Sequence, residues 1–125
     1  MSDSSPSTKK RVLVVDDNAI NRRLAIAFVT RLGFDSDEAE GGPQALAKLA
    51  ASDFDVVLLD ISMPVMSGEE VLARVRADSR LGGLRVIAYT AHALPEEKQR
   101  LLDAGFDELL IKPITLKAVE AILVG

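Results

Sequence analysis

The stretch that decides the fold is Val-Val-Leu-Leu-Asp-Ile-Ser-Met-Pro, residues 56–64. Its four aliphatic residues show no polar alternation, which is typical of a strand buried on both faces of a parallel sheet. The charge of Asp60 is too costly for such a core, so we expect this residue where the strand leaves the sheet. Pro64 and Gly68 favour an irregular loop before the next helix. The sequence therefore predicts a carboxylate held on a rigid strand beneath a loop.

Further short segments on either side of this strand have the composition of strands, and apolar residues recur at helical spacing between them. The other expected strands cover residues 12–15, 34–40, 84–90 and 108–111, with 34–40 at an edge of the sheet. The expected helices run over residues 19–32, 43–51, 67–75, 94–104 and 115–123. Because each parallel crossover needs a helix, this alternation predicts an α/β fold, a doubly wound (βα)5 unit around a five-stranded parallel sheet.

Length and composition fit one domain and limit its partners. The 125 residues are 48% hydrophobic, enough for one real core. A formal charge of −4 argues against a nucleic-acid partner, and the absence of cysteine excludes thiolate metal sites and suits a cytoplasmic location. No apolar run approaches the roughly 20 residues of a membrane span, so we expect a soluble protein that does not enter a membrane. Residues 1–10 are polar and Ser-rich and are expected to form a disordered tail before a domain over residues 11–125.

Polar side chains that can carry chemistry follow four of the expected strands. They are Asp16-Asp17, Asp60, Thr90 and Lys112. In doubly wound sheets the functional crevice lies beyond the carboxyl ends of the strands, so we expect all of them at one edge. Carboxylates crowded there repel one another unless a cation lies among them. Oxygen ligands without His or Cys favour a hard divalent ion, Mg²⁺ before the softer metals.

The same groups suit phosphoryl transfer. A carboxylate can attack a phosphoryl group and form an aspartyl phosphate if a metal and a lysine neutralise the phosphoryl oxygens. Lys112 and the Thr90 hydroxyl supply a cation and a hydrogen-bond donor for those oxygens. Backbone N–H groups around Ser62 and Ala91 can add further donors. The pattern therefore indicates Asp60 as a nucleophile.

Simpler structural interpretations exist for each of these residues taken alone. Residues 16–18, Asp-Asp-Asn, can cap the helix that follows them. Asp60 can be an ordinary residue of a turn after a strand. Thr90 can be a β-favouring residue, and Lys112 a lysine whose charged end reaches solvent. Only the complete set favours chemistry over these interpretations.

Other polar residues are assigned no chemistry from the sequence alone. His92 is interpreted as a solvated loop residue, because no second His or Cys supports a site. Arg22, Arg23 and Arg31 are interpreted as a solvated face of the first helix.

The chain resembles the receiver domains of two-component response regulators over about residues 10–123. Four motifs carry the resemblance in order: VLVVDDN (12–18), VVLLDISMPVMSG (56–68), VIAYTA (86–91) and LLIKP (109–113). The resemblance implies the strand order 2-1-3-4-5. Residues 16–22, DDNAINR, are more similar to the receivers of hybrid histidine kinases and phosphorelays than to those joined to DNA-binding domains.

The resemblance implies roles for the acidic residues. Asp60 would be the phosphoacceptor, taking a phosphoryl group from a phosphohistidine. Asp17, Asp60 and the carbonyl of Ser62 would bind Mg²⁺ directly, and Asp16 would help through water. Mn²⁺ is expected to substitute for Mg²⁺.

It also implies roles for the residues after the fourth and fifth strands. Thr90 would be the switch hydroxyl, and Lys112 would pair with the phosphoryl group and precede a cis peptide bond to Pro113. The usual aromatic switch position holds Leu109, and Tyr89 beside Thr90 is a candidate for a related part. Ser62 and His92 occupy positions that tune dephosphorylation in the family.

The expected function is a receiver that phosphorylates and dephosphorylates itself rather than turning over a substrate. Its expected partners are a sensor histidine kinase or a histidine phosphotransfer protein, and a downstream protein target. One alternative is a relay intermediate that passes the phosphoryl group to a phosphotransfer protein. A second is a phosphatase of the haloacid dehalogenase kind, although such enzymes have an Asp where this chain has Ser62. A third is a binding module that is never phosphorylated.

Overall fold

The structure is a computed structural model that describes residues 10–91 and 94–124. Its five strands are β1 (Arg11–Val15), β2 (Asp35–Ala39), β3 (Val56–Asp60), β4 (Arg85–Thr90) and β5 (Glu108–Ile111). They form one parallel sheet in the order β2-β1-β3-β4-β5. The predicted doubly wound architecture and the strand order are therefore confirmed, including the assignment of β2 to an edge.

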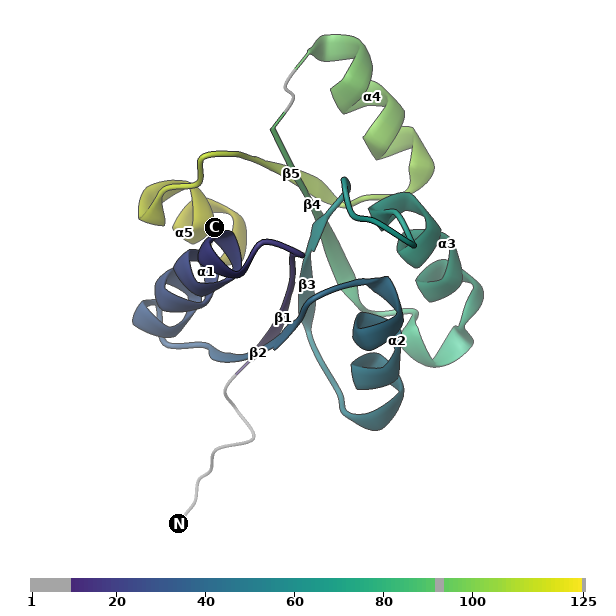
Figure 1. Cartoon of the computed structure of the whole chain (residues 1–125), viewed down its shortest axis with the longest axis horizontal. Helices are drawn as coiled ribbons and strands as arrows, with labels where there is room; N and C mark the ends of the chain where they lie inside the picture. The colour runs from purple at the N-terminus through teal and green to yellow at the C-terminus, as the bar shows by residue number, and fades with distance from the viewer. Residues whose placement is uncertain (1–9, 92–93, 125) are drawn as a thin grey trace.

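Helices cover both faces of the sheet (Figure 1). They are α1 (Ala19–Arg31), α2 (Gly42–Ala51), α3 (Gly68–Ala77), α4 (Pro95–Ala104) and α5 (Leu116–Leu123). α1 and α5 pack on one face and α2, α3 and α4 on the other (Figure 1), where the buried Leu101 of α4 belongs to the same hydrophobic cluster as side chains of α2 and α3. Two hydrophobic clusters follow from this arrangement, one on each face, because successive side chains of a strand point to opposite sides. The central strand β3 is buried along its whole length, as its apolar run predicts.

Helix ends follow the local sequence signals. The Ser67 side chain accepts from the N–H of Glu70, whose side chain accepts from the N–H of Ser67, so the predicted capping box forms at α3. Thr115 caps α5 by accepting from the N–H of Ala118. A short 3₁₀ helix, Ser79–Leu81, follows α3 and was not predicted.

Some expectations fall on residues that the structure does not describe or concern a membrane. The expected disordered tail lies outside the described residues, apart from Lys10, and so does His92. Within residues 10–91 and 94–124, no helix combines the length and the hydropathy needed to cross a membrane.

The register of the strands brings their carboxyl ends together. Val15 of β1 pairs with Leu59 of β3, so Asp16 and Asp60 each come one residue later on neighbouring strands. Asp60 pairs with Tyr89, the residue before Thr90. Polar groups that are far apart in the sequence thus share one edge of the sheet, as predicted.

Candidate functional site

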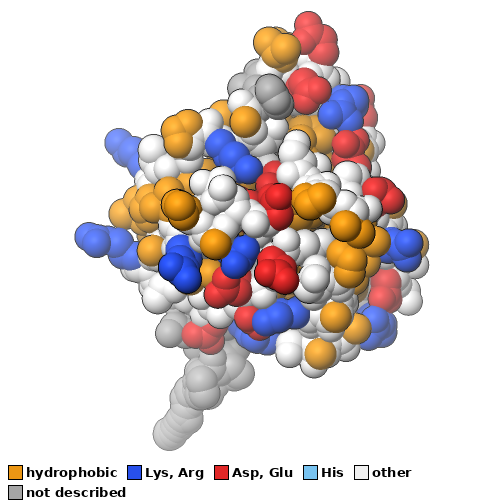
Figure 2. All heavy atoms as spheres, in the orientation of Figure 1, with side chains coloured by type: hydrophobic (Ala, Val, Ile, Leu, Met, Phe, Trp, Pro, Cys, Tyr) orange, Lys and Arg blue, Asp and Glu red, His pale blue; other side chains and the backbone are white. Residues whose placement is uncertain are grey.

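Three carboxylates converge at the edge where β1 and β3 end. The ligand atoms of Asp16, Asp17 and Asp60 all lie within 4.8 Å of one another. Asp16 and Asp60 are buried, with exposed fractions of 0% and 2%, whereas Asp17 is exposed. Figure 2 shows acidic side chains near the middle of the face in view, with basic and hydrophobic side chains around them. The cluster is therefore shielded from solvent at Asp16 and Asp60 and open to solvent at Asp17.

Asp60 is held from two sides at the end of β3. Its Oδ1 accepts from the N–H of Ser62 at 3.0 Å, and its Oδ2 lies 3.3 Å from the Lys112 Nζ. Burial raises the pKa of Asp60 to about 6, although the Ser62 N–H and the Lys112 ammonium both favour the carboxylate. The nearby Asp16 carboxylate adds to the increase. The carboxylate is thus ionised near neutral pH but carries a substantial desolvation cost.

Asp16 is fixed at three of its four polar atoms. Its N–H donates to the Ala39 carbonyl at 3.2 Å, its Oδ1 accepts from the N–H of Asn18 at 2.8 Å, and its carbonyl accepts from Arg22. The fourth atom, Oδ2, is buried and has no hydrogen-bond partner among the described residues. The Lys112 Nζ lies 3.8 Å from it.

This donor set fits a hard divalent cation. A buried carboxylate oxygen without a hydrogen-bond partner is costly, and two further carboxylates lie beside it. All three are oxygen donors, and one remains accessible from solvent. The capping interpretation of residues 16–18 applies only to Asn18, whose side chain accepts from the N–H of Asn21. Neither Asp16 nor Asp17 caps α1, so both belong to the acidic cluster.

Thr90 and Lys112 complete the edge from β4 and from the loop after β5. The Thr90 side chain is buried at the last position of β4, and its carbonyl accepts from the Lys112 N–H at 2.8 Å. The Lys112 Nζ also lies 4.6 Å from the centroid of the Tyr89 ring. The Lys112–Pro113 peptide bond is cis, as expected. The ammonium group is thus aimed at the carboxylates by its backbone and by the aromatic ring beneath it.

The loop after β3 returns tightly to the strand that it leaves. The N–H of Gly68 donates to the Ile61 carbonyl at 3.3 Å. A Cβ at position 68 would lie 2.6 Å from the Asp60 carbonyl oxygen, which no side chain allows. In between, Val65 has a φ of 71° and is 91% exposed, so a β-branched residue holds a left-handed conformation at the tip of the loop.

The two candidate switch side chains lie on opposite faces of the sheet. Tyr89 is buried with the cluster beneath α1 and α5, and burial together with Asp16 and Asp60 raises its pKa to about 12. Leu109 is partly buried against the other cluster. Of these two side chains, it is therefore the Tyr89 ring that lies next to the Lys112 ammonium.

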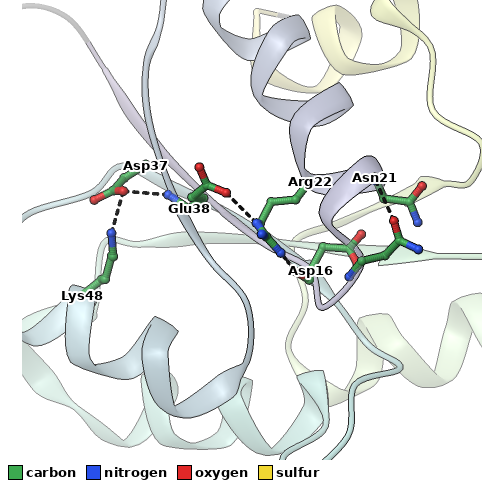
Figure 3. Close-up of polar contacts among 7 residues, drawn as sticks. Asp16, Asn21, Arg22, Asp37, Glu38 and Lys48 are labelled. Carbon is green, nitrogen blue, oxygen red and sulfur yellow. Dashed lines mark hydrogen bonds and ion pairs between the residues drawn. The ribbon is translucent and has the colours of Figure 1, made fainter.

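One structural interpretation of the sequence was wrong. The Arg22 side chain does not belong to a solvated face: it is 14% exposed and reaches from α1 to the edge strand (Figure 3). Its Nε donates to Glu38 Oε1 at 2.6 Å, and its Nη1 donates to the Asp16 carbonyl at 2.7 Å. Arg23 and Arg31 are exposed, as predicted. The spacing of α1 gave no sign of this contact, because one partner is a backbone carbonyl and the other lies on β2.

Comparison with known proteins decides the family. The family model of the response regulator receiver domain matches residues 12–124. This chain is a response regulator receiver domain. Among curated proteins, the sensor histidine kinase RcsC of Escherichia coli K12 is 43% identical over 94% of the chain. The sensor protein GacS of Pseudomonas syringae is 38% identical over 87% of it. The chain spans only 13% and 12% of the lengths of these two relatives.

Solved structures agree with the fold of this receiver domain. The chemotaxis response regulator CheY4 of Vibrio cholerae has a TM-score of 0.87 at 31% identity, with 93% of this chain and 97% of that chain covered. The receiver domain of the sensor histidine kinase PA1611 of Pseudomonas aeruginosa has a TM-score of 0.83 at 29% identity, with 92% and 94% covered. Its structure has a magnesium ion coordinated in the active site cleft. The resemblance read from the four sequence motifs is confirmed.

Proposed function

We propose that Asp60 accepts a phosphoryl group from a partner's phosphohistidine and later loses it to water. The observation that carries the proposal is the position of Asp60: a buried carboxylate 3.3 Å from the Lys112 ammonium, within 4.8 Å of two further carboxylates. In the transfer, a carboxylate oxygen of Asp60 forms the new P–O bond while the P–N bond of the donor breaks. The imidazole of the donor leaves with the electron pair of that bond and takes up a proton.

The neighbours of Asp60 have distinct roles in this proposal. Lys112 neutralises charge on the phosphoryl oxygens, and the Thr90 hydroxyl donates a hydrogen bond to one of them. The backbone N–H groups of Ser62 and Ala91 offer further donors. In the structure the Ser62 N–H is already directed at Asp60 Oδ1. Transfer therefore requires little movement of the main chain on this side of the site.

The residues that would hold Mg²⁺ are Asp16, Asp17, Asp60 and the carbonyl of Ser62. When bound, Mg²⁺ neutralises the carboxylates and polarises the phosphoryl group. The receiver domain of PA1611 supports this assignment, since it holds magnesium in the active site cleft. We expect Mn²⁺ to substitute, because its preference for oxygen ligands is similar.

Signal output is proposed to begin at Thr90, whose hydroxyl turns toward the phosphoryl group. Leu109 replaces the aromatic residue that usually takes part in that movement, so no ring at position 109 can change its packing when Thr90 moves. Ser62 is exposed beside Asp60 and is placed to influence the approach of water. The same tuning role for His92 remains a prediction.

The proposed partners are a sensor histidine kinase or a histidine phosphotransfer protein as donor, and a downstream protein as target. The named relatives are sensor kinases, which supports a donor of this kind. The relay alternative is not favoured over the terminal receiver. A cytoplasmic location and the absence of nucleic-acid and membrane partners remain predictions.

Labelling with acetyl phosphate tests the proposal. Wild-type protein should take up label that hydroxylamine removes, and it should need Mg²⁺ or Mn²⁺ to do so, because the carboxylates otherwise repel the donor. The Asp60→Asn variant should take up none. Persistence of the label in that variant, or full labelling in the presence of a chelator, would contradict the assignment of Asp60 or of the metal. A protein that takes up no label under any condition would instead support the unphosphorylated binding module.

A further inference from the structure

Arg22 links the acidic cluster to the edge of the sheet. From the first turn of α1, its guanidinium reaches the Asp16 carbonyl with Nη1 and the Glu38 carboxylate with Nε (Figure 3). The two distances are 2.7 and 2.6 Å, and only 14% of the side chain is exposed. A charge-assisted bond in such a shielded position is strong. The contact therefore holds three elements, β1, β2 and α1, at one point beside the site.

The bond acts on the peptide that joins the two acidic residues. The carbonyl of Asp16 and the N–H of Asp17 belong to one planar peptide unit, so fixing the carbonyl fixes the plane from which Asp17 departs. Asp17 is exposed, whereas Asp16 is buried. The direction of the Asp17 carboxylate thus depends on this peptide plane.

Two further bonds close the same segment on itself. The N–H of Arg22 donates to the Asn18 carbonyl at 2.9 Å, and the N–H of Asn21 donates to the Asn18 side chain at 3.0 Å. The segment from Asp16 to Arg22 is therefore one hydrogen-bonded unit. Within it, the Arg22 side chain supplies the bond that reaches the peptide between the two acids.

Glu38 keeps the guanidinium from acting as a competing cation. Arg22 contacts the carbonyl of Asp16 and not its carboxylate, and its charge is compensated by Glu38. Lys48 pairs in a separate contact with Asp37 at 2.7 Å and does not share this carboxylate. Arg22 thus lies beside the acidic cluster, while its positive charge is compensated by Glu38 on the side away from that cluster.

We infer that Arg22 is a positioning residue for the metal site, which orients the Asp16–Asp17 peptide so that both carboxylates face one cation. This inference rests on the metal site of the proposed function. Partners that orient metal ligands typically contribute 10–100-fold in affinity. Since Arg22 acts through one peptide bond, we expect a loss of about tenfold in Mg²⁺ affinity when its side chain is removed.

The sign of the effect separates positioning from simple charge. Removing a positive charge near a cation site should strengthen Mg²⁺ binding if only Coulomb forces act. Loss of positioning should weaken it. Arg22→Lys keeps the charge but lacks the rigid guanidinium fork, whose Nε and Nη1 reach the two acceptors in fixed directions, so it should also weaken binding. Arg23→Ala removes a charge from an exposed position of the same helix and serves as the matched control.

The test measures the dissociation constant for Mg²⁺ alone by titration calorimetry in the full chain, with the thermal unfolding of each variant recorded in parallel. We expect about tenfold weaker binding in Arg22→Ala, a similar change in Arg22→Lys, and no weakening in Arg23→Ala. Unchanged or tighter binding in a folded Arg22 variant would overturn the inference, even if its melting temperature falls. Should Arg22→Ala fail to fold, Arg22→Lys decides in the same way. If wild-type protein binds no Mg²⁺, the metal site and this inference both fail, whereas normal wild-type binding with unchanged variants refutes the inference alone.

Discussion

At the scale of single residues, Asp60 combines burial with a charge that the site needs. Raising its pKa from 3.8 to about 6 costs the ionised state about 3 kcal/mol in the folded protein. This cost is what remains after the Lys112 ammonium and the Ser62 N–H have favoured the carboxylate. The metal-free protein is therefore destabilised at the position where it is proposed to react.

Asp60→Asn should stabilise the metal-free protein at pH 7 by about 1–3 kcal/mol, because the amide has no charge to bury. The folded carboxyl has the higher pKa and binds its proton first as the pH falls. Between pH 6 and 4 the wild-type protein therefore gains stability relative to the variant, and below about pH 4 the difference should disappear. Urea unfolding of both proteins at several pH values measures this. A variant that is less stable than wild type at pH 7 would contradict the prediction.

At the scale of elements, the start of α3 approaches the end of β3 as closely as a glycine permits. A Cβ at position 68 would lie 2.6 Å from the Asp60 carbonyl oxygen and 2.7 Å from the Ile61 Cα. Both atoms belong to the backbone, so neither can rotate away. The loop that carries Ser62 and Val65 is thus closed against the strand by the absence of one side chain.

Gly68→Ala should lower the free energy of unfolding by about 1–3 kcal/mol, because the loop and the first turn of α3 must shift to admit the methyl group. Gly83→Ala is the matched control, since no atom lies within 4 Å of a Cβ at that position. The control should be as stable as wild type or slightly more stable. Chemical unfolding of the two variants compares them, and equal stabilities would show that the loop is not closed in this way.

The elements also show which features the sequence could predict. The strands, the helices and the capping box at Ser67 follow from hydrophobic period and local side-chain chemistry, and they form as predicted. Val65 could not be predicted in a left-handed conformation, because a β-branched residue disfavours it. The backbone conformation of Val65 is imposed by the closure of the loop, and that closure is determined by the residues on either side.

At the scale of the whole molecule, parallel topology does most of the work of assembling the site. Neighbouring strands of one parallel sheet end at or just before Asp16, Asp60, Thr90 and Lys112. Because parallel strands have their carboxyl ends at the same edge of the sheet, these residues must lie there together. This explains why the candidate site could be read from the sequence before its geometry was known. The contacts of Arg22 could not be predicted, because they depend on how α1 crosses the sheet. In addition, one partner is a backbone carbonyl, which every residue has, so no residue type in the sequence indicates the bond.

Binding of Mg²⁺ should stabilise the whole domain. The ion binds the folded state alone, so a concentration ten times the dissociation constant should add about 1.4 kcal/mol to the free energy of unfolding. Thermal unfolding with and without Mg²⁺ measures the gain. Asp60→Asn should gain clearly less, because it lacks one of the three carboxylates. Equal gains in both proteins would place the ion elsewhere.

The most direct test of the central claim identifies the phosphorylated residue. Protein incubated with acetyl phosphate and Mg²⁺ is reduced with borohydride, which converts an aspartyl phosphate to homoserine, and its peptides are then sequenced by mass spectrometry. The account predicts homoserine at position 60 and at no other aspartate, and none when Mg²⁺ is withheld. Homoserine at position 16 or 17, or a fully unmodified position 60 in labelled protein, would contradict it.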